Sequence, residues 1–157
     1  MMEVVNLLEH ELKWDDDDPP GYNAGYSMIG PLLGASELGM TISELPPGQS
    51  ICPYHFEYGR EEWVLVLGGR PTLRTPQGER ELEPGDVACF PEGPDGAHKV
   101  TNRGDGHVRV AMLSTKQDPT IAVYPDSNKI GAWTRHSPEH KIIARLGSDV
   151  DYYDGEL

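Results

Sequence analysis

The chain has 157 residues, of which 37% are hydrophobic and 25% are charged, and its formal net charge is −13. This length fits one domain with its own hydrophobic core, and the negative charge argues against nucleic acid or an anionic membrane surface as a partner. No apolar run approaches the roughly 20 residues that span a bilayer, and no signal-peptide pattern opens the chain, so we expect a cytoplasmic protein.

The first 37 residues predict an arm that packs on the rest of the domain. Apolar residues between positions 4 and 14 could cover one side of a short helix or of an edge strand. The acidic run 15–18, followed by Pro-Pro-Gly at 19–21, then ends any regular structure. We interpret this run and the acidic C-terminal residues 149–156 as solvated chain rather than as metal or partner sites.

From residue 38 the pattern is one of short strands separated by turns. The expected strands cover residues 38–45, 51–57, 63–67, 71–75, 79–82, 87–90, 98–102, 107–114 and 121–124. Turn residues at 76–78 and at 104–106 predict two hairpins, 71–75 with 79–82 and 98–102 with 107–114. Short strands at nearly regular spacing are typical of a β-sandwich or β-barrel. Residues 125–157 are polar and predict an irregular C-terminal tail.

Two cysteines are too few for a disulfide scaffold. Cys89 lies in the apolar run Val-Ala-Cys-Phe, which predicts a small buried thiol. Cys52 is close to His55 in sequence, but its opposite strand parity and the intervening Pro53 make it a poor candidate for a metal ligand.

Four residues between positions 55 and 98 could form a metal site. His55 and Glu57 are two positions apart and therefore lie on one face of an extended strand. Glu62 opens an apolar run, and His98 follows a turn rich in proline and glycine. Two imidazoles and two carboxylates that converge inside a small barrel would bind a divalent metal. The alternatives are that each histidine is an ordinary hydrogen-bonded residue and that Glu57 is not a direct ligand.

Strand parity gives a further expectation for the run that follows Glu62. If Glu62 points inward, so do Val64 and Val66, whereas Trp63, Leu65 and Leu67 point outward. This outward set is too apolar to remain in water. It must be covered by other parts of the chain or by a second subunit, and we expect a homodimer.

The segments 48–69 and 85–102 resemble the two sequence motifs of the cupin superfamily. In the first segment, six residues separate Glu62 from Gly69, as in the family pattern. The chain departs from that pattern at Glu57, which stands where the family usually has a second histidine. Gly48 is also one residue further from His55 than in the pattern.

The second segment matches over Gly85 to Pro91, which leaves five intervening residues, and over His98 to Asn102, which leaves three. Only the gap between Gly93 and His98 departs, by two additional residues.

The resemblance implies an all-β double-stranded β-helix, or jelly-roll barrel, over residues 38–124, with an irregular N-terminal arm (1–37) and C-terminal tail (125–157). It implies one divalent transition metal, Fe, Mn, Ni, Co or Zn, held by His55, Glu57, Glu62 and His98. Glu61 is then the outward-facing neighbour of Glu62. Such mixed nitrogen and oxygen ligands suit these metals, whereas calcium requires more oxygens.

The resemblance leaves the activity open, because cupins include oxygenases, isomerases, decarboxylases and binding proteins. We expect a small polar or carboxylate-bearing molecule as the ligand, with the metal acting as Lewis acid or O₂ site if the chain is an enzyme. The alternative is a non-catalytic metal or small-molecule binding module. Arg60, Arg70 and Arg74 could steer an anionic substrate or could simply be solvated. The sequence assigns no catalytic residue, and a general base could only be a spare carboxylate such as Glu61.

Overall fold

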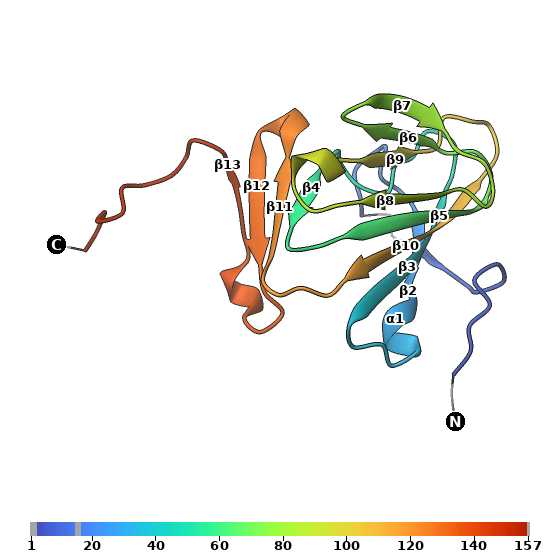
Figure 1. Cartoon of the computed structure of the whole chain (residues 1–157), viewed down its shortest axis with the longest axis horizontal. Coiled ribbons are helices and arrows are strands. Elements are labelled where there is room, and N and C mark those ends of the chain that lie inside the picture. Colours follow the sequence, from blue (N-terminus) through green and yellow to red (C-terminus); the bar gives the residue numbers. More distant parts are fainter. Residues whose placement is uncertain (1–2, 15–16, 157) are drawn as a thin grey trace.

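Antiparallel β-strands make up almost all the regular structure of the protein in its computed structural model, which describes residues 3–14 and 17–156 (Figure 1). The strands are β1 (Lys13–Trp14), β2 (Gly25–Met28), β3 (Leu38–Leu45), β4 (Phe56–Tyr58), β5 (Glu62–Gly68), β6 (Thr72–Thr75), β7 (Gly78–Glu81), β8 (Val87–Phe90), β9 (Lys99–Thr101), β10 (Val108–Thr115), β11 (Thr120–Tyr124), β12 (Lys129–Trp133) and β13 (Ile142–Arg145). The helical elements are short: α1 (Ile29–Leu32) and the 3₁₀ turns Pro94–Gly96, Pro125–Ser127 and Pro138–His140.

The strands form three sheets with the orders β1-β2-β3-β10-β5-β8, β13-β12-β11-β4 and β7-β6-β9. This arrangement confirms the predicted all-β class and β-barrel architecture. The predicted hairpin of β6 and β7 is also present, with Thr75 opposite Gly78 at its closed end. No described helix is long and apolar enough to cross a membrane.

The core lies between the sheets, and the alternation of β5 shows how the sequence fills it. Val64 and Val66 are 0% and 1% exposed. Trp63, which directly precedes Val64 on the strand, is 43% exposed. The core also receives residues from β3, β6, β8, β9 and β10. The predicted parity of β5 is therefore confirmed.

The prediction that Cys89 is buried is wrong. On β8 it is Ala88 and Phe90 that pack against the core, so the thiol of Cys89 faces outward and is exposed. The apolar neighbours of Cys89 in the sequence indicated burial, but the period of two along a strand places it on the opposite face from both of them.

The predicted hairpin of β9 with β10 is also wrong. β9 pairs with β6, whereas β10 lies between β3 and β5 in the large sheet. The turn signal at 104–106 is real, but here it marks a corner at which the chain passes from one sheet to another. Asn102 holds this corner, because its Nδ2 donates to the carbonyl oxygens of Leu45 and Gly106, each at 2.7 Å.

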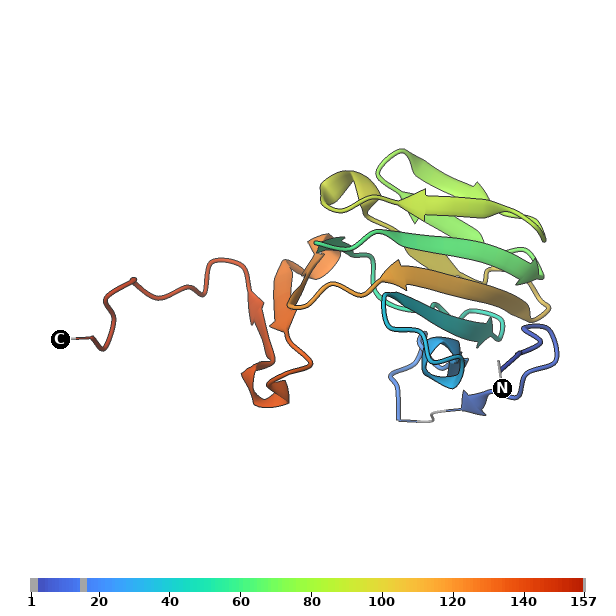
Figure 2. The same ribbon diagram turned by 60° about the horizontal axis from the view of Figure 1, so that its bottom comes forward.

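The segment after residue 124 is more regular than predicted. β12 pairs with β11 and β13 pairs with β12, so the expectation of an irregular tail is wrong for residues 129–145. These short, mixed runs gain their strand structure from pairing with the neighbouring strand, β12 with β11 and β13 with β12, rather than from a pattern of their own. Beyond residue 146 the chain runs away from the body as an exposed tail (Figures 1 and 2), as we expected for its acidic residues.

The N-terminal segment contacts the large sheet. β1 and β2 pair at its edge, and Arg109 of β10 donates to the carbonyl oxygens of Leu7 and His10 at 3.0 and 2.6 Å. The predicted acidic break lies partly outside the described residues, since Asp15 and Asp16 are not among them.

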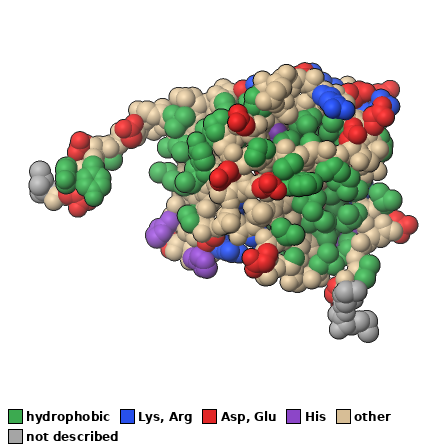
Figure 3. Space-filling view, in the orientation of Figure 1, with side chains coloured by type: hydrophobic (Ala, Val, Ile, Leu, Met, Phe, Trp, Pro, Cys, Tyr) green, Lys and Arg blue, Asp and Glu red, His purple; other side chains and the backbone are tan. Residues whose placement is uncertain are grey.

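Part of the outer face of the large sheet stays uncovered. Hydrophobic side chains gather over β5, β10 and β3 in the space-filling view (Figure 3). Among them, Trp63 is 43% exposed and Val87 of the neighbouring β8 is 54% exposed.

Candidate metal centre

The two predicted histidine ligands lie side by side. His55 directly precedes β4 and His98 directly precedes β9, and together they form an isolated antiparallel bridge. Each backbone N–H donates to the carbonyl oxygen of the other residue, at 3.2 and 2.8 Å. The centroids of the two rings are 4.8 Å apart. The bridge therefore joins the two motif segments at their histidines.

Backbone carbonyls fix which nitrogen of each ring can bind a metal. Nδ1 of His55 lies 3.0 Å from the carbonyl oxygen of Pro53, and Nδ1 of His98 lies 2.9 Å from that of Gly96. A carbonyl oxygen only accepts hydrogen bonds, so Nδ1 carries the proton in both rings. Nε2 is then the nitrogen left for a metal, as in metal-ligating histidines whose other nitrogen donates to a carbonyl.

Glu62 completes a cluster of three potential ligands. Its Oε2 lies 3.6 Å from Nε2 of His55 and 3.6 Å from Nε2 of His98. One potential ligand atom from each of the three residues lies within 4.8 Å of the others. Glu61, by contrast, faces outward and accepts a hydrogen bond from Nε1 of Trp63 at 2.7 Å, as expected for the neighbour of a ligand.

Because His98 is buried, leaving its Nε2 without a hydrogen-bond partner costs free energy. The side chain is 2% exposed, and its Nε2 has no hydrogen-bond partner among the described residues. A buried polar group without a partner costs about 1–3 kcal/mol. A metal ion bound at this nitrogen would remove that cost.

The protonation of the two rings indicates competition between a proton and a metal. Burial and the neighbouring His55 lower the pKa of His98 to about 4. Burial also acts to lower the pKa of His55, but Cys52 and the Glu62 carboxylate outweigh it and raise that pKa. A proton on His55 therefore balances the charge of Glu62, and a divalent cation at the same nitrogens would displace it.

Glu57 lies beside this cluster but is not one of its three members. It is 9% exposed, and its Oε2 lies 3.6 Å from Nε of Arg60. That Oε2 has no hydrogen-bond partner among the described residues. Burial, followed by the charge of Glu62, raises the pKa of Glu57. The structure thus brings together three of the four predicted ligands and places the fourth nearby.

Two aromatic rings that the sequence did not single out support the histidines. Phe90 stacks on His98 with ring centroids 3.7 Å apart, and Tyr124 stacks on His55 at 5.9 Å. Phe90 is opposite Glu62 in the β5–β8 register, so strand parity could have identified it. Tyr124 directly follows Val123, which is opposite Phe56 in the β4–β11 register, and no local pattern predicts this long-range pairing.

The three arginines considered as steering groups differ in their surroundings. Arg70 pairs with Glu81 and Glu83, and Arg74 pairs with Asp126, all on the surface. Only Arg60 approaches the metal centre, through Glu57. Cys52 contacts Nδ1 of His55 at 3.6 Å and is not part of the cluster.

The donor set fits a divalent transition metal. Two neutral imidazole nitrogens and one carboxylate oxygen suit Fe²⁺, Mn²⁺, Co²⁺, Ni²⁺ or Zn²⁺, and they correspond to the two-histidine, one-carboxylate set of non-haem iron sites. Calcium requires more oxygen ligands than the cluster offers.

Comparison with solved structures gives neighbours with the same fold. A proposed sugar phosphate isomerase from Acidithiobacillus ferrooxidans has a TM-score of 0.80 at 21% identity, covering 91% of this chain and 90% of that one. A sugar phosphate isomerase of the cupin superfamily from Silicibacter pomeroyi has a TM-score of 0.80 at 24% identity, covering 97% and 98%. The polyketide cyclase RemF from Streptomyces resistomycificus reaches 0.60 at 23% identity, covering 76% and 84%.

Sequence comparison points to the same family. A search of curated proteins gives no match. The profile described as "Cupin domain" matches residues 41–114, a range that contains His55, Glu62 and His98. This match, the motif spacings and the fold of the neighbours agree that residues 41–114 are similar to the cupin superfamily.

Proposed function

We propose that the chain binds one divalent transition metal through His55, Glu62 and His98 and uses it on a small polar or carboxylate-bearing molecule. The observation that carries this proposal is the buried Nε2 of His98, which lacks a hydrogen-bond partner and lies beside Glu62 and Nε2 of His55. The carbonyls of Pro53 and Gly96 already orient both rings through Nδ1, so binding would require little reorganisation beyond loss of the additional proton from His55.

Glu57 remains our proposed fourth ligand. Its Oε2 is buried without a hydrogen-bond partner among the described residues, which is the same condition as that of Nε2 in His98. With Glu57 included, two carboxylates would neutralise the charge of a divalent ion. Arg60 at 3.6 Å is then the group that orients this carboxylate.

The metal would act as a Lewis acid that polarises an oxygen atom of the bound small molecule. The chain's own residues orient the site: the carbonyls of Pro53 and Gly96 hold the imidazoles, and Phe90 and Tyr124 pack on their faces. Among oxygenation, decarboxylation and isomerisation, isomerisation has the most support, because the two structures with a TM-score of 0.80 are described as isomerases. A carboxyl group that moves a proton would be Glu57 if it does not ligate.

A non-catalytic metal or small-molecule binding module is the second candidate. The outward orientation of Glu61 favours this candidate, because it removes one carboxylate that could have moved a proton at the metal centre and leaves Glu57 for that role. A catalytic role therefore depends on what Glu57 does.

Metal analysis of the purified protein tests the proposal, followed by titration of the metal-free protein with Mn²⁺, Fe²⁺, Co²⁺, Ni²⁺ and Zn²⁺ under anaerobic conditions. We expect one ion per chain, and we expect His98→Gln to abolish tight binding. His107→Gln is the matched control, since His107 is an exposed histidine paired with Glu44. Equal metal content in wild type and His98→Gln would refute the assignment of the site.

A further inference from the structure

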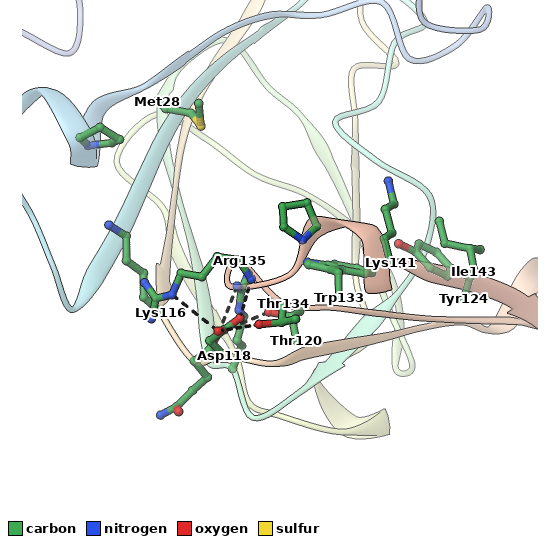
Figure 4. A pocket seen from close by; sticks show the side chains of 14 residues that line it. Met28, Lys116, Asp118, Thr120, Tyr124, Trp133, Thr134, Arg135, Lys141 and Ile143 are labelled. Carbon is green, nitrogen blue, oxygen red and sulfur yellow. Dashed lines mark hydrogen bonds and ion pairs between the residues drawn. The ribbon is translucent and has the colours of Figure 1, made fainter.

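A second feature of the fold is a pocket of about 750 Å³ beside the metal centre (Figure 4). It lies between the sheet β13-β12-β11-β4 and the segment that contains Met28 and Pro31. In the close-up, Tyr124, Trp133 and Ile143 lie along one side, Lys116 and Asp118 lie at another, and Met28 stands apart from both.

Strand register places the floor of this pocket on the same face as Glu57. Glu57 is opposite Ala122 in the pairing of β4 with β11, and Trp133 is opposite Thr120 in the pairing of β11 with β12. Residues two apart on a strand share a face. Thr120, Ala122 and Tyr124 therefore form one continuous surface with Glu57.

Two residues belong to both the pocket and the surroundings of the metal centre. Tyr124 lines the pocket and stacks on the ring of His55. Arg60 lines the pocket and lies 3.6 Å from the carboxylate of Glu57. A molecule in the pocket would thus extend toward the candidate ligands.

The charge of the pocket is opposite to that of the chain. Its lining contains four cationic side chains and one carboxylate, although the whole chain carries −13. The cations are Arg60, Lys116, Arg135 and Lys141, and the carboxylate is Asp118. Such a concentration of positive charge in a concave, partly apolar site favours an anionic ligand.

The cationic side chains of the pocket differ in the hydrogen bonds and ion pairs that they already make within the protein. Lys116 donates to the carbonyl oxygen of Ala35 at 2.7 Å, and Nε of Arg135 lies 3.8 Å from Asp118. The ammonium group of Lys141 makes no hydrogen bond or ion pair with any described side chain. Arg135 and Lys141 are therefore the groups most available to a ligand.

Trp133 supplies an apolar wall that depends on a glycine. A Cβ added at Gly131 would lie 2.8 Å from Cζ3 of Trp133 and 3.4 Å from Cγ1 of Ile143. The indole therefore rests close over the backbone of Gly131. A flat aromatic surface of this kind packs well against the carbon skeleton of a polar ligand.

We propose that this pocket binds the anionic group, a phosphate monoester or a carboxylate, of the molecule whose other end reaches the metal centre. This deepens the proposed function and rests on it. Apart from Arg60, the lining residues lie outside the segment 41–114 that matches the family profile. The anion site is thus built largely by the residues that flank the matched segment.

The test compares three probes with the same pyranose ring that differ at C6: glucose 6-phosphate, glucuronate and glucose. Binding to the wild-type protein is measured by calorimetry at low ionic strength, where charge contributes most. We expect glucose 6-phosphate or glucuronate to bind about tenfold or more tightly than glucose, the effect of one charge-assisted contact. The tighter of the two identifies phosphate or carboxylate as the preferred anion. Equal affinities for all three probes would overturn the proposal.

Two variants locate the binding site. Arg135→Gln combined with Lys141→Gln should weaken the anionic probe about tenfold or more. Arg103→Gln is the matched control, because Arg103 pairs with Glu79 away from the pocket. Gly131→Ala should weaken all three probes by displacing Trp133. An anion affinity that is unchanged in the double variant, or that falls equally in the control, would overturn the assignment.

The variant His98→Gln separates this proposal from the metal assignment. It should lose the metal but keep the preference for the anionic probe over glucose. If wild type contains no metal yet shows that preference, the proposed function fails and the anion site stands. If wild type binds metal but not the anionic probes, the anion site fails and the metal assignment stands.

Discussion

Replacing Asn102 by alanine should destabilise the fold substantially. The side chain is 0% exposed, and its Nδ2 donates to the carbonyl oxygens of Leu45 and Gly106, each at 2.7 Å. Its Oδ1 accepts a hydrogen bond from the backbone N–H of Gly104 at 3.0 Å. These three bonds hold the corner at which the chain passes from β9 to β10.

The expected magnitude follows from what each partner can do after the substitution. Gly104 and Gly106 are exposed, so water can replace the lost bonds at a net cost of about 0.5–1.5 kcal/mol each. The carbonyl of Leu45 lies in a fully buried residue, and loss of its donor costs about 1–3 kcal/mol. The total is about 4 kcal/mol, which corresponds to a fall in Tm of roughly 8–16 °C for a domain of this size.

Urea and thermal unfolding of the variants measure this effect. Gln77→Ala is the control, because the exposed side chain of Gln77 makes no hydrogen bond with any described residue, so the change should stay within about 0.5 kcal/mol. Asn102→Asp should be at least as unstable as Asn102→Ala at neutral pH, since a carboxylate oxygen would face two carbonyl oxygens. A loss in Asn102→Ala below about 1 kcal/mol would refute the role of this corner.

Three further predictions concern the metal centre and the outer face. Metal at one hundred times its Kd should stabilise the fold by about 2.7 kcal/mol. Calorimetry with and without chelator should show that this gain in stability shrinks as pH falls, because the raised pKa of His55 means that a proton competes with the metal for Nε2. A Tm that does not change after confirmed metal loss would contradict this prediction. In metal titrations, Glu57→Ala should weaken every divalent ion and Glu57→His should shift preference from Mn²⁺ toward Ni²⁺, whereas unchanged affinity in Glu57→Ala would exclude it as a ligand. Trp63→Asp should convert a homodimer to a monomer in sedimentation experiments, and a wild type that is monomeric at all concentrations would contradict this.

Strand parity explains which residues could be placed from the sequence. Val64 and Val66 were placed correctly, because inward and outward positions alternate along any strand once one residue is oriented. The apolar composition around Cys89 predicts burial, but the alternation along the strand decides its orientation. The same rule, applied to β8, puts Ala88 and Phe90 inward and Cys89 outward.

Pairing partners were less predictable than strands. The turn at 104–106 was identified correctly, but no local signal says that β9 pairs with β6 and that β10 inserts between β3 and β5. For the same reason β12 and β13 were missed, since each is ordered by its neighbour in the sheet. Long-range pairing, rather than propensity, decides structure in these short segments.

The candidate metal centre was more predictable than the pocket beside it. His55, Glu62 and His98 lie in motif segments with fixed spacing, and the bridge between the two histidines then brings these segments together. Whether Glu57 ligates depends on side-chain conformation and on Arg60, neither of which spacing determines.

The division between motif and flanking segments also bears on how this protein would select its ligand. The candidate metal ligands lie within residues 41–114, whereas the cationic and aromatic groups of the pocket lie mostly at 116–143. A metal ion polarises many oxygen ligands alike, so it discriminates poorly between small polar molecules. Charged groups beside the metal centre discriminate better, because a ligand without the matching anion gains no charge-assisted contact with them. If the metal supplies reactivity, selectivity should therefore reside in β11, β12 and β13 and in the turns around Arg135 and Lys141.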